Sequence, residues 1–348
     1  MKSYETHLAE LVENPSRWLV TGAAGFIGSH LVETLLRHDQ EVVGLDNFST
    51  GHRRNLDDVE RLVGADRWKR FRLIEGDVSD LDVCREAVQG AHYVLHQAAL
   101  GSVPRSIDNP VATNRANIDG FLNIVLAARD EQVRSFVYAG SSSTYGDEPN
   151  LPKLEDRIGR PLSPYAVTKY VNELYADVFG RLFGLRSTGL RYFNVFGPRQ
   201  NPDGPYAAVI PRWINAVASG DTVFINGDGT TSRDFCFIAN VVQANILAAL
   251  RTAGDTHLVC NVAVGGRTTL TQLHDMIVKE VEAIEPNFSM QPPVYRDFRA
   301  GDTAHSLADI TRAKTYLGYE PTDTIQTGLK KTVAWFLERH HELMGKSR

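Results

Sequence analysis

The stretch LVTGAAGFIGSH, residues 19–30, decides the fold, because it places three glycines between an apolar strand and an amphipathic helix. Gly22 permits a tight turn after the strand, and Gly25 lets backbone N–H groups approach a pyrophosphate. Gly28 brings the helix close to the sheet, and the N-terminus of that helix favours an anion. Asp46 ends the next apolar stretch, 18 residues after Gly28. The pattern therefore predicts the first βαβ unit of a dinucleotide-binding domain.

The end of that second strand indicates which dinucleotide binds. Asp46 would accept hydrogen bonds from the adenosine ribose hydroxyls, and its carboxylate would repel a 2′-phosphate. The sequence therefore predicts NAD rather than NADP, and Arg53 and Arg54 further along do not change this. Asp77, after another strand, is a candidate partner for the adenine amino group. In the stretch HQAAL, Gln97 to Leu100 would line the cofactor with small side chains.

Apolar strands and amphipathic helices alternate along the first half of the chain. The strand-like stretches are RWLVTG, EVVGLD, FRLIEGD, HYVLHQAA and SFVYAGSS, and the clearest helical ones are GFIGSHLVETLLRH and NIDGFLNIVLAARDE. This alternation predicts an α/β fold with a Rossmann-type, doubly wound parallel sheet covered by helices on both faces.

The alternation becomes less regular after about residue 194, where stretches such as FGPRQNPDGP are rich in Pro and Gly. We expect a smaller C-terminal substrate lobe, interleaved with the sheet domain. The expected boundaries are a helical extension at 1–16, the NAD-binding domain at 17–193, a return to it at 237–262, and the substrate lobe at 194–236 and 263–348.

Composition and charge exclude several classes of protein. The chain has 348 residues and a formal net charge of −5, with both signs spread along it, so nothing predicts a nucleic-acid or membrane partner. Cys84, Cys236 and Cys260 lack the spacing of a metal site or a disulfide framework, which indicates free thiols in a reducing compartment and no metal. No stretch has the pattern of a signal peptide or of a transmembrane helix. We expect a cytoplasmic protein.

A second stretch, SPYAVTKYV at residues 163–171, places Tyr165 and Lys169 four residues apart. On a helix this spacing puts both side chains on one face. Taken alone, the pair is either a proton-transfer device or an ordinary surface pair.

Four motifs together resemble the extended branch of the short-chain dehydrogenase/reductase superfamily. They are TGAAGFIG (21–28), SSSTYG (141–146), YAVTKY (165–170) and RYFNVFGP (191–198). That branch contains nucleotide-sugar epimerases, dehydratases and decarboxylases, and the resemblance runs from about residue 17 to near the end of the chain.

The resemblance implies a catalytic set of Ser141, Tyr165 and Lys169. A free tyrosine has a pKa of about 10, and a nearby lysine ammonium together with a positive nicotinamide ring would favour its phenolate. Tyr165 would then be a base near neutral pH, and Lys169 would also bond the nicotinamide ribose. The further cofactor contacts that the resemblance implies are Phe26, Ile27, Asn47, Ser49, Gly51, Val78, Gln97, Ala98, Ala99, Asn117, Tyr192 and Val195.

The two residues after Ser141 separate the reactions of this branch. In the dehydratases they resemble Asp-Glu, and in the decarboxylases the second is typically Glu. Ser142 and Ser143 cannot supply an acid/base pair for elimination. The resemblance therefore implies a 4-epimerase, in which Tyr165 takes the proton of the C4 hydroxyl while a hydride passes to NAD. The 4-keto sugar turns, the hydride returns to its other face, and NAD stays bound.

Similarity to UDP-galactose 4-epimerases implies a UDP-sugar as the substrate. Asn194, Arg233 and Arg299 correspond to diphosphate-binding residues, since guanidinium groups suit phosphate oxygens. Asp302 corresponds to a carboxylate on the nucleotide ribose. The substrate-binding residues implied around the uracil and the sugar are Gly101, Ser102, Ser141, Ser142, Ser143, Gln200, Ala208, Val209, Asn226 and Ser306.

Ser306 bears on the choice of sugar. Bacterial UDP-galactose 4-epimerases often carry a bulky Tyr at this position, beside C2, and a Ser leaves room for an acetamido group. Gly101 stands where many of them have Lys. This set resembles the N-acetylhexosamine-selective epimerases of bacterial surface-polysaccharide synthesis, of the O-antigen type, which implies conversion between UDP-GlcNAc and UDP-GalNAc and between their uronic acids.

Three alternatives stay open. The nearest is a UDP-glucose or UDP-glucuronate 4-epimerase, followed by a nucleotide-sugar dehydratase or decarboxylase, and then by a non-catalytic NAD-binding protein on this fold. The family commonly forms homodimers through two helices of each subunit, one of which is the helix from Tyr165 to Phe183. The apolar positions Val171, Leu174, Val178 and Leu182 suit such an interface, or packing on the sheet.

Overall fold

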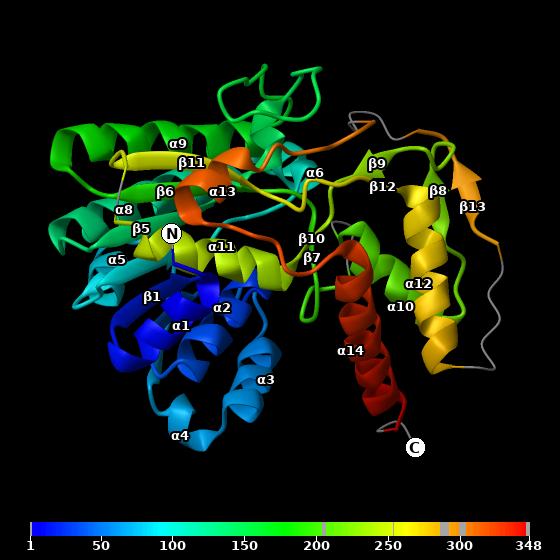
Figure 1. The fold of residues 1–348 in the computed structure, drawn as a ribbon, viewed down its shortest axis with the longest axis horizontal. Coiled ribbons are helices and arrows are strands. Elements are labelled where there is room, and N and C mark those ends of the chain that lie inside the picture. Colours follow the sequence, from blue (N-terminus) through cyan, green and yellow to red (C-terminus); the bar gives the residue numbers. More distant parts are fainter. Residues whose placement is uncertain (1, 204–206, 253, 286–291, 299–303, 346–348) are drawn as a thin grey trace.

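A computed structural model describes residues 2–203, 207–252, 254–285, 292–298 and 304–345 (Figure 1). Seven strands form the central sheet, in the order β11-β6-β5-β4-β1-β2-β3, and every neighbouring pair in it is parallel. The strands are β1 (Arg17–Thr21), β2 (Glu41–Asp46), β3 (Phe71–Glu75), β4 (Tyr93–His96), β5 (Ser135–Ser141), β6 (Ser187–Tyr192) and β11 (His257–Val262). The prediction of a doubly wound parallel sheet is confirmed.

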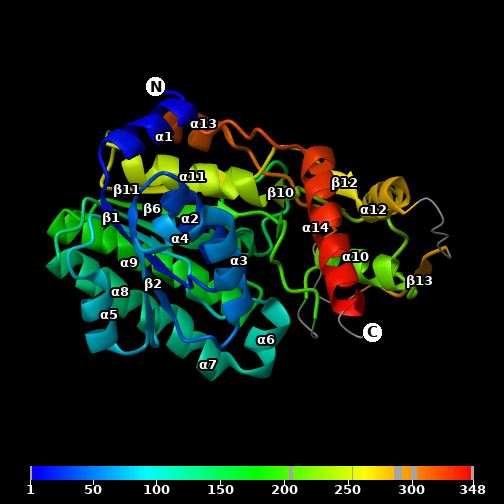
Figure 2. The same ribbon diagram turned by 90° about the horizontal axis from the view of Figure 1, so that it is seen from below.

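Helices cover both faces of this sheet (Figures 1 and 2). On one face α5 packs on α8 and α8 packs on α9, and on the other face α11 packs on α2 and α1 packs on α11. The helices of the sheet domain are α1 (Tyr4–Glu13), α2 (Phe26–Arg37), α3 (Arg53–Val63), α4 (Ala65–Trp68), α5 (Leu81–Val88), α6 (Val103–Asp108), α7 (Pro110–Asn114), the π-helical turn η1 (Arg115–Asp119), α8 (Gly120–Asp130), the 3₁₀ turn η2 (Ser142–Tyr145), α9 (Pro164–Phe183) and α11 (Ile238–Leu250).

The strand order places the site. The chain runs outward from β1 through β2 to β3, and then crosses to the other side of β1 to form β4. In open α/β sheets the connections after two such strands diverge, which leaves a crevice at their carboxyl ends. The residues at these ends are Thr21, Asp46, His96 and Ser141.

A smaller lobe is built from segments after residue 194. It contains α10 (Val209–Ser219), α12 (Leu270–Ile284), α14 (Ile325–Gly345) and the paired strands β7 (Val195–Phe196) with β10 (Cys236–Phe237), β8 (Phe224–Asn226) with β13 (Val294–Arg296), and β9 (Ser232–Arg233) with β12 (Thr268–Thr269). Figure 1 shows α10, α12 and α14 side by side, away from the sheet. α13 (Thr311–Leu317) departs from the expected division, because it packs on α11 and β11 of the sheet domain.

Local signals set the bounds of α9, which carries the Tyr-x-x-x-Lys motif. Ser163 caps its first turn by accepting a hydrogen bond from the amide of Ala166, and Pro164 occupies the first helical position. Gly184 ends the helix in the left-handed conformation, at φ +71°. Tyr165 and Lys169 therefore lie in the first two turns, close to the carboxyl end of β5.

Candidate active site

The glycine-rich turn after β1 is closely packed. The Gly22 amide donates to the Leu45 carbonyl over 2.7 Å, and Gly22 has φ +68°. A Cβ on Gly28 would lie 2.0 Å from the Gly22 carbonyl oxygen, so only glycine lets α2 approach the turn. α2 begins directly after this turn, and its N-terminal amides provide a place for a phosphate.

Asp46 lies at the end of β2 and is almost fully buried. One carboxylate oxygen accepts from the Ala24 amide over 2.8 Å and the other accepts from the Phe48 amide over 2.8 Å. Burial raises the pKa of this carboxyl, while the two amides act in the opposite direction. Each oxygen keeps a further lone pair, which can accept from a ribose hydroxyl.

The nearest cation in the sequence does not neutralise Asp46. Arg53 pairs instead with Glu75 over 3.0 Å, and its guanidinium lies 4.6 Å from the Phe48 ring centroid. The predicted adenine partner Asp77 accepts a hydrogen bond from Asn47 over 2.8 Å, so these two predicted cofactor residues lie together.

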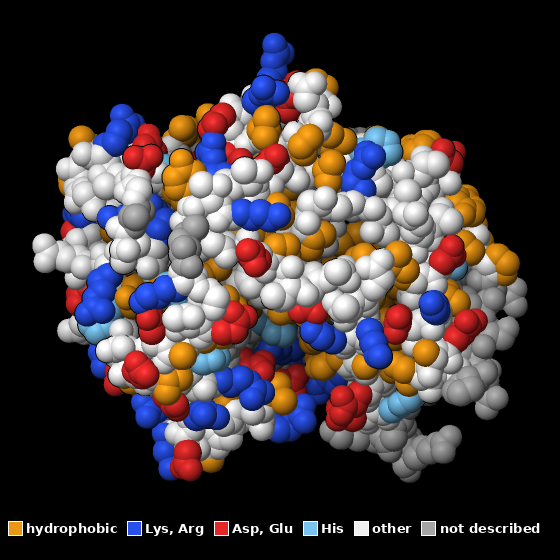
Figure 3. Space-filling model, viewed as in Figure 1, with side chains coloured by type: hydrophobic (Ala, Val, Ile, Leu, Met, Phe, Trp, Pro, Cys, Tyr) orange, Lys and Arg blue, Asp and Glu red, His pale blue; other side chains and the backbone are white. Residues whose placement is uncertain are grey.

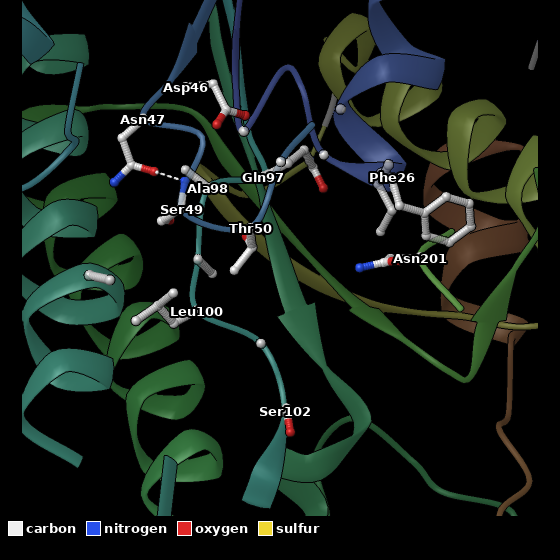
Figure 4. A pocket seen from close by; sticks show the side chains of 18 of the residues that line it. Phe26, Asp46, Asn47, Ser49, Thr50, Gln97, Ala98, Leu100, Ser102 and Asn201 are labelled. Atoms are coloured by element: carbon white, nitrogen blue, oxygen red, sulfur yellow. Dashed lines mark hydrogen bonds between the residues drawn. The ribbon is translucent and has the colours of Figure 1, made fainter. Parts of the chain in front are cut away.

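A cavity of about 500 Å³ joins these groups. Figure 4 shows Asp46, Asn47, Ser49 and Gln97 around a common opening. The predicted residues that line this cavity are Gly22, Gly25, Phe26, Ile27, Gly28, Asp46, Asn47, Ser49, Gly51, Asp77, Val78, Gln97, Ala98, Ala99, Gly101, Ser102, Gln200 and Ala208. Leu100, predicted as part of the stretch HQAAL, lines it as well, and lining residues that were not predicted include Thr50, Arg105, Asn201 and Asp203.

Gln97 belongs to a buried hydrogen-bond network that sequence reasoning found only in part. Tyr192 donates to the Gln97 side chain over 3.0 Å, and Gln97 donates to Asn245 over 3.0 Å. Asn245 also bonds the Tyr192 hydroxyl, over 2.9 Å. Asn245 was missed, although a fully buried Asn in the apolar helix α11 is a signal that could have found it. Of the other predicted cofactor residues, Val195 forms part of β7.

The predicted catalytic side chains meet where β5 ends and α9 begins. The Ser141 hydroxyl lies close enough to Tyr165 to favour its phenolate, against the effect of burial on the pKa of Tyr165. The Ser143 hydroxyl donates to the Ser141 hydroxyl over 2.9 Å, and the Ser143 amide donates to it over 3.2 Å. The Lys169 ammonium is buried, lies 5.9 Å from the Tyr165 ring centroid and donates to the Ala139 carbonyl over 2.9 Å.

Burial is the main influence on the pKa values of Tyr165 and Lys169. Burial raises the pKa of Tyr165 above its ordinary value, and only the hydrogen bond from Ser141 opposes this. Burial also lowers the pKa of Lys169 to about 8. These shifts belong to the protein without NAD. The prediction that the Lys169 ammonium and the positive nicotinamide ring together make Tyr165 a base near neutral pH concerns the NAD complex and stays a prediction.

Both polar atoms of the Asn117 side chain bond other protein groups. Its side-chain oxygen accepts from the Leu100 amide over 2.7 Å, and its nitrogen donates to the Leu100 carbonyl and to Thr168, each over 3.1 Å. Asn117 lies in the π-helical turn η1 and joins the loop after β4 to α9. It does not line the cavity that most of the predicted cofactor residues share. These bonds position Leu100, and a contact of Asn117 with the cofactor stays a prediction.

Three of the predicted substrate residues lie around β9 (Ser232–Arg233). Asn194 has φ +36° and donates to the Asp234 carbonyl over 3.2 Å. Arg233 donates to the Ala304 carbonyl over 3.2 Å, and the Ser306 amide donates to the Ser232 carbonyl over 3.0 Å.

Other predicted substrate residues lie in separate segments of the chain. Gln200 donates to the Val195 carbonyl over 3.1 Å. Val209 begins α10, directly after Ala208. Asn226 lines a second cavity of about 1040 Å³, together with Arg212 and Arg296. Arg299 and Asp302 lie outside the described residues.

The site fits NAD. The close approach of Gly28 to Gly22, the open lone pairs of Asp46 and the buried ammonium of Lys169 provide partners for a pyrophosphate and for two riboses. The part of the chain that the structure describes contains no cluster of His, Cys, Asp and Glu that could hold a metal ion. None of the helices among the described residues is long and apolar enough to cross a membrane.

Comparisons with known proteins agree with this geometry. Residues 18–263 match the sequence profile of the NAD dependent epimerase/dehydratase family. A UDP-glucose 4-epimerase of Mycolicibacterium smegmatis is 37% identical over 323 residues, which cover 92% of this chain and 98% of the relative. A UDP-glucuronate 4-epimerase of Arabidopsis thaliana is 33% identical over 338 residues, which cover 92% of this chain and 75% of the relative.

A solved structure is similar to this chain in both fold and sequence. It is a UDP-N-acetylglucosamine 4-epimerase from Methanobrevibacter ruminantium in complex with UDP-N-acetylmuramic acid, with a TM-score of 0.84 and 37% sequence identity. The match covers 93% of this chain and 99% of that one. The glycine turn, Asp46 and the Ser-Tyr-Lys set are thus found in a chain that belongs to the NAD-dependent epimerase/dehydratase family.

Proposed function

We propose that this protein is a UDP-sugar 4-epimerase that retains NAD and prefers N-acetylhexosamines. The observation that carries the proposal is the cluster of Ser143, Ser141 and Tyr165, in which Ser143 donates to Ser141, together with the buried Lys169 and the dinucleotide cavity. These residues can move a proton, and none of the three serines from Ser141 to Ser143 can act as a carboxylate acid or base. The site therefore favours reversible oxidation over elimination.

The roles follow from the geometry. When bound, NAD supplies reversible oxidation at carbon 4 of the sugar. Tyr165 removes the proton of the C4 hydroxyl and later returns it, and Ser141 holds that oxygen by a hydrogen bond. Ser143 donates to Ser141, which leaves the Ser141 proton free to point at Tyr165 or at the substrate. Lys169 bonds the nicotinamide ribose and keeps a positive charge near the phenol.

Two residues and one comparison support the preference for an acetamido group. Ser306 lies beside Ser232, next in sequence to Arg233, so a small side chain stands close to a candidate diphosphate-binding guanidinium. A Cβ on Gly101 would meet no atom within 4 Å, which leaves space at that end of the cavity. The similar structure from Methanobrevibacter ruminantium, with its bound UDP-N-acetylmuramic acid, favours the same sugar class.

The alternative function is a UDP-glucose or UDP-glucuronate 4-epimerase. It is favoured by the similar enzymes of Mycolicibacterium smegmatis and Arabidopsis thaliana and requires the same catalytic set. We place the protein in bacterial surface-polysaccharide synthesis of the O-antigen type, and in the cytoplasm, where UDP-sugars are the expected partners. The buried free thiols of Cys84, Cys236 and Cys260 suit a reducing compartment.

A homodimer is part of the proposal. Leu174, Val178 and Leu182 are exposed on α9 rather than packed on the sheet, and Val171 is partly exposed. Ile107 and Val111 are exposed on α6 and α7, which pack against α9. This face offers apolar surface for a second copy.

The charged side chains on the surface are mixed in sign. Figure 3, which looks along the shortest axis of the molecule, shows Lys and Arg interspersed with Asp and Glu.

Substitution of Ser306 tests the sugar preference. Ser306→Tyr fills the space beside C2 and should lower turnover of UDP-GlcNAc at least tenfold more than turnover of UDP-glucose, a discrimination of about 1.4 kcal/mol. Ser306→Ala keeps the space and is the matched control. Equal losses with both sugars would contradict the assignment of Ser306.

Substitution of Tyr165 tests the chemistry. Tyr165→Phe should reduce kcat by about 10²-fold or more while the affinity for UDP-sugar changes little. Tyr170→Phe, on the same helix, is the matched control and should keep normal turnover. Near-normal turnover of the Tyr165 variant would remove this residue from the mechanism.

A further inference from the structure

The segment that carries Ser306 is held in place by its neighbours. We call residues 304–309 the Ser306 strip. The Ser232 amide donates to the Ala304 carbonyl over 3.1 Å, and the Ser306 amide donates back to the Ser232 carbonyl over 3.0 Å. On its other edge the Lys153 amide donates to the Leu307 carbonyl over 2.8 Å. The strip therefore lies as an extended segment between β9 and the chain around Lys153, parallel to both.

One buried carboxylate joins this strip to two other segments. Asp234 is fully buried. Its Oδ1 accepts from the Val264 amide over 3.1 Å, and its Oδ2 accepts from the Gly265 amide over 3.1 Å and from the Ala308 amide over 3.2 Å. Val264 and Gly265 follow β11, at the carboxyl edge of the sheet. Asp234 thus ties the strip to the sheet domain from the strand pair that carries Arg233.

Asp234 also adjoins the candidate diphosphate-binding residues Asn194 and Arg233. The Asp234 carbonyl accepts from the Asn194 side chain over 3.2 Å, and Arg233 directly precedes Asp234. Arg233 also donates to the Ala304 carbonyl, at the start of the strip. Ser306 therefore lies between a contact of Arg233 at residue 304 and a contact of Asp234 at Ala308.

We propose that Asp234 is the positioning residue of the sugar pocket, which sets the place of Ser306 relative to Arg233 and Asn194 and so the preference for the C2 substituent. The inference rests on the proposed UDP-sugar 4-epimerase function. The Asp234 carboxylate is buried away from solvent and bonds backbone amides, so we assign it a positioning role rather than a catalytic one. A displacement of about 1 Å in a positioned group is enough to change turnover by about 10²-fold.

Protonation offers a way to separate positioning from folding. Burial raises the pKa of Asp234 to about 6 against the effect of its amide donors. The folded carboxyl therefore binds a proton more readily than the unfolded one between pH 3.8 and pH 6, so acid in this window does not remove stability through Asp234. It does replace one acceptor lone pair by a donor among amides that also donate, which loosens the strip locally.

Other titratable groups lie close to Asp234. Burial raises the pKa of Cys236 to about 12 and raises that of Tyr319 as well, so both stay neutral through this window. His305, on the strip, bonds the Ser232 hydroxyl over 2.9 Å. The His305→Asn variant removes this imidazole from the comparison.

The first experiment compares Asp234→Asn with the wild-type protein. kcat and KM are measured for UDP-GlcNAc and UDP-glucose, together with the NAD content and the Tm. We expect the ratio of kcat/KM for UDP-GlcNAc to that for UDP-glucose to fall roughly tenfold, mainly through KM, with NAD content unchanged. Asp80→Asn is the matched control, because Asp80 also accepts from two backbone amides, in the cap of α5.

Each outcome decides the inference. An unchanged ratio in a folded Asp234→Asn variant overturns it, and so does an equal loss with both sugars accompanied only by a lower Tm. If the variant does not fold, the His305→Asn protein is assayed at pH 7.5 and pH 5.5. A several-fold fall of the ratio at pH 5.5 supports the inference, and a constant ratio overturns it. Absence of turnover by the wild-type protein contradicts the proposed function, and the inference with it.

Discussion

Replacement of Lys169 by Met should change how stability depends on pH. The fall of the Lys169 pKa from 10.5 to about 8 corresponds to a penalty of about 3 kcal/mol for keeping its ammonium charged in the folded protein. The penalty is fully present below pH 8. Between pH 8 and pH 10.5 the unfolded chain binds more protons at this site than the folded chain, so stability rises with pH.

The Lys169→Met variant lacks this group and should lack its part of the pH dependence. The two pKa values of Lys169, in the unfolded and the folded chain, determine the size of this effect. Between pH 7 and pH 9.5 the unfolding free energy of the wild type should rise by about 2 kcal/mol relative to that of the variant. Urea unfolding of both proteins after removal of NAD measures the difference, and Lys69→Met, at an exposed lysine, is the control. A difference that stays constant over this range would refute the account of Lys169 as a buried charge. The variant should also lose turnover, because in the proposed mechanism the Lys169 ammonium bonds the nicotinamide ribose and lies near the phenol of Tyr165.

Two further substitutions test the packing and the electrostatics. Gly28→Ala places a Cβ 2.0 Å from the Gly22 carbonyl oxygen and should abolish retention of NAD. The assay is the amount of NAD that the purified protein releases on denaturation. Gly266→Ala, whose Cβ would have one neighbour at 3.9 Å, is the control and should retain NAD. Normal NAD content in Gly28→Ala would contradict the packing described. Glu173→Gln leaves buried Arg191 without its carboxylate partner at 2.7 Å and should lower the unfolding free energy by about 3–5 kcal/mol. A loss below 1 kcal/mol in urea unfolding would contradict this.

The parts of the site that the sequence predicted are those that local spacing determines. Gly22, Gly28 and Asp46 lie within one βαβ unit, where the lengths of a strand and a helix bring them together. The cap at Ser163 and the four-residue spacing of Tyr165 and Lys169 likewise depend on one helix. The parallel sheet followed from the alternation of apolar strands and amphipathic helices.

The residues that were missed act over long separations in the chain. Asn245 meets Gln97 across 148 residues, and Asp234 meets Ala308 across 74. A single buried polar residue in a sequence does not reveal its partner. The position of α13 on the sheet domain was missed for the same reason. The raised pKa of Tyr165 depends on burial, which the spacing of its motif does not report.

The most direct test of the central claim is incubation of the purified wild-type protein with UDP-GlcNAc and no added NAD, followed by separation of the nucleotide sugars. A UDP-sugar 4-epimerase with resident NAD converts part of the substrate to UDP-GalNAc without net oxidation. Conversion of UDP-glucose alone would contradict the sugar preference and leave the epimerase reaction intact. An oxidised or dehydrated product, or the absence of any product from either sugar, would contradict the proposed function.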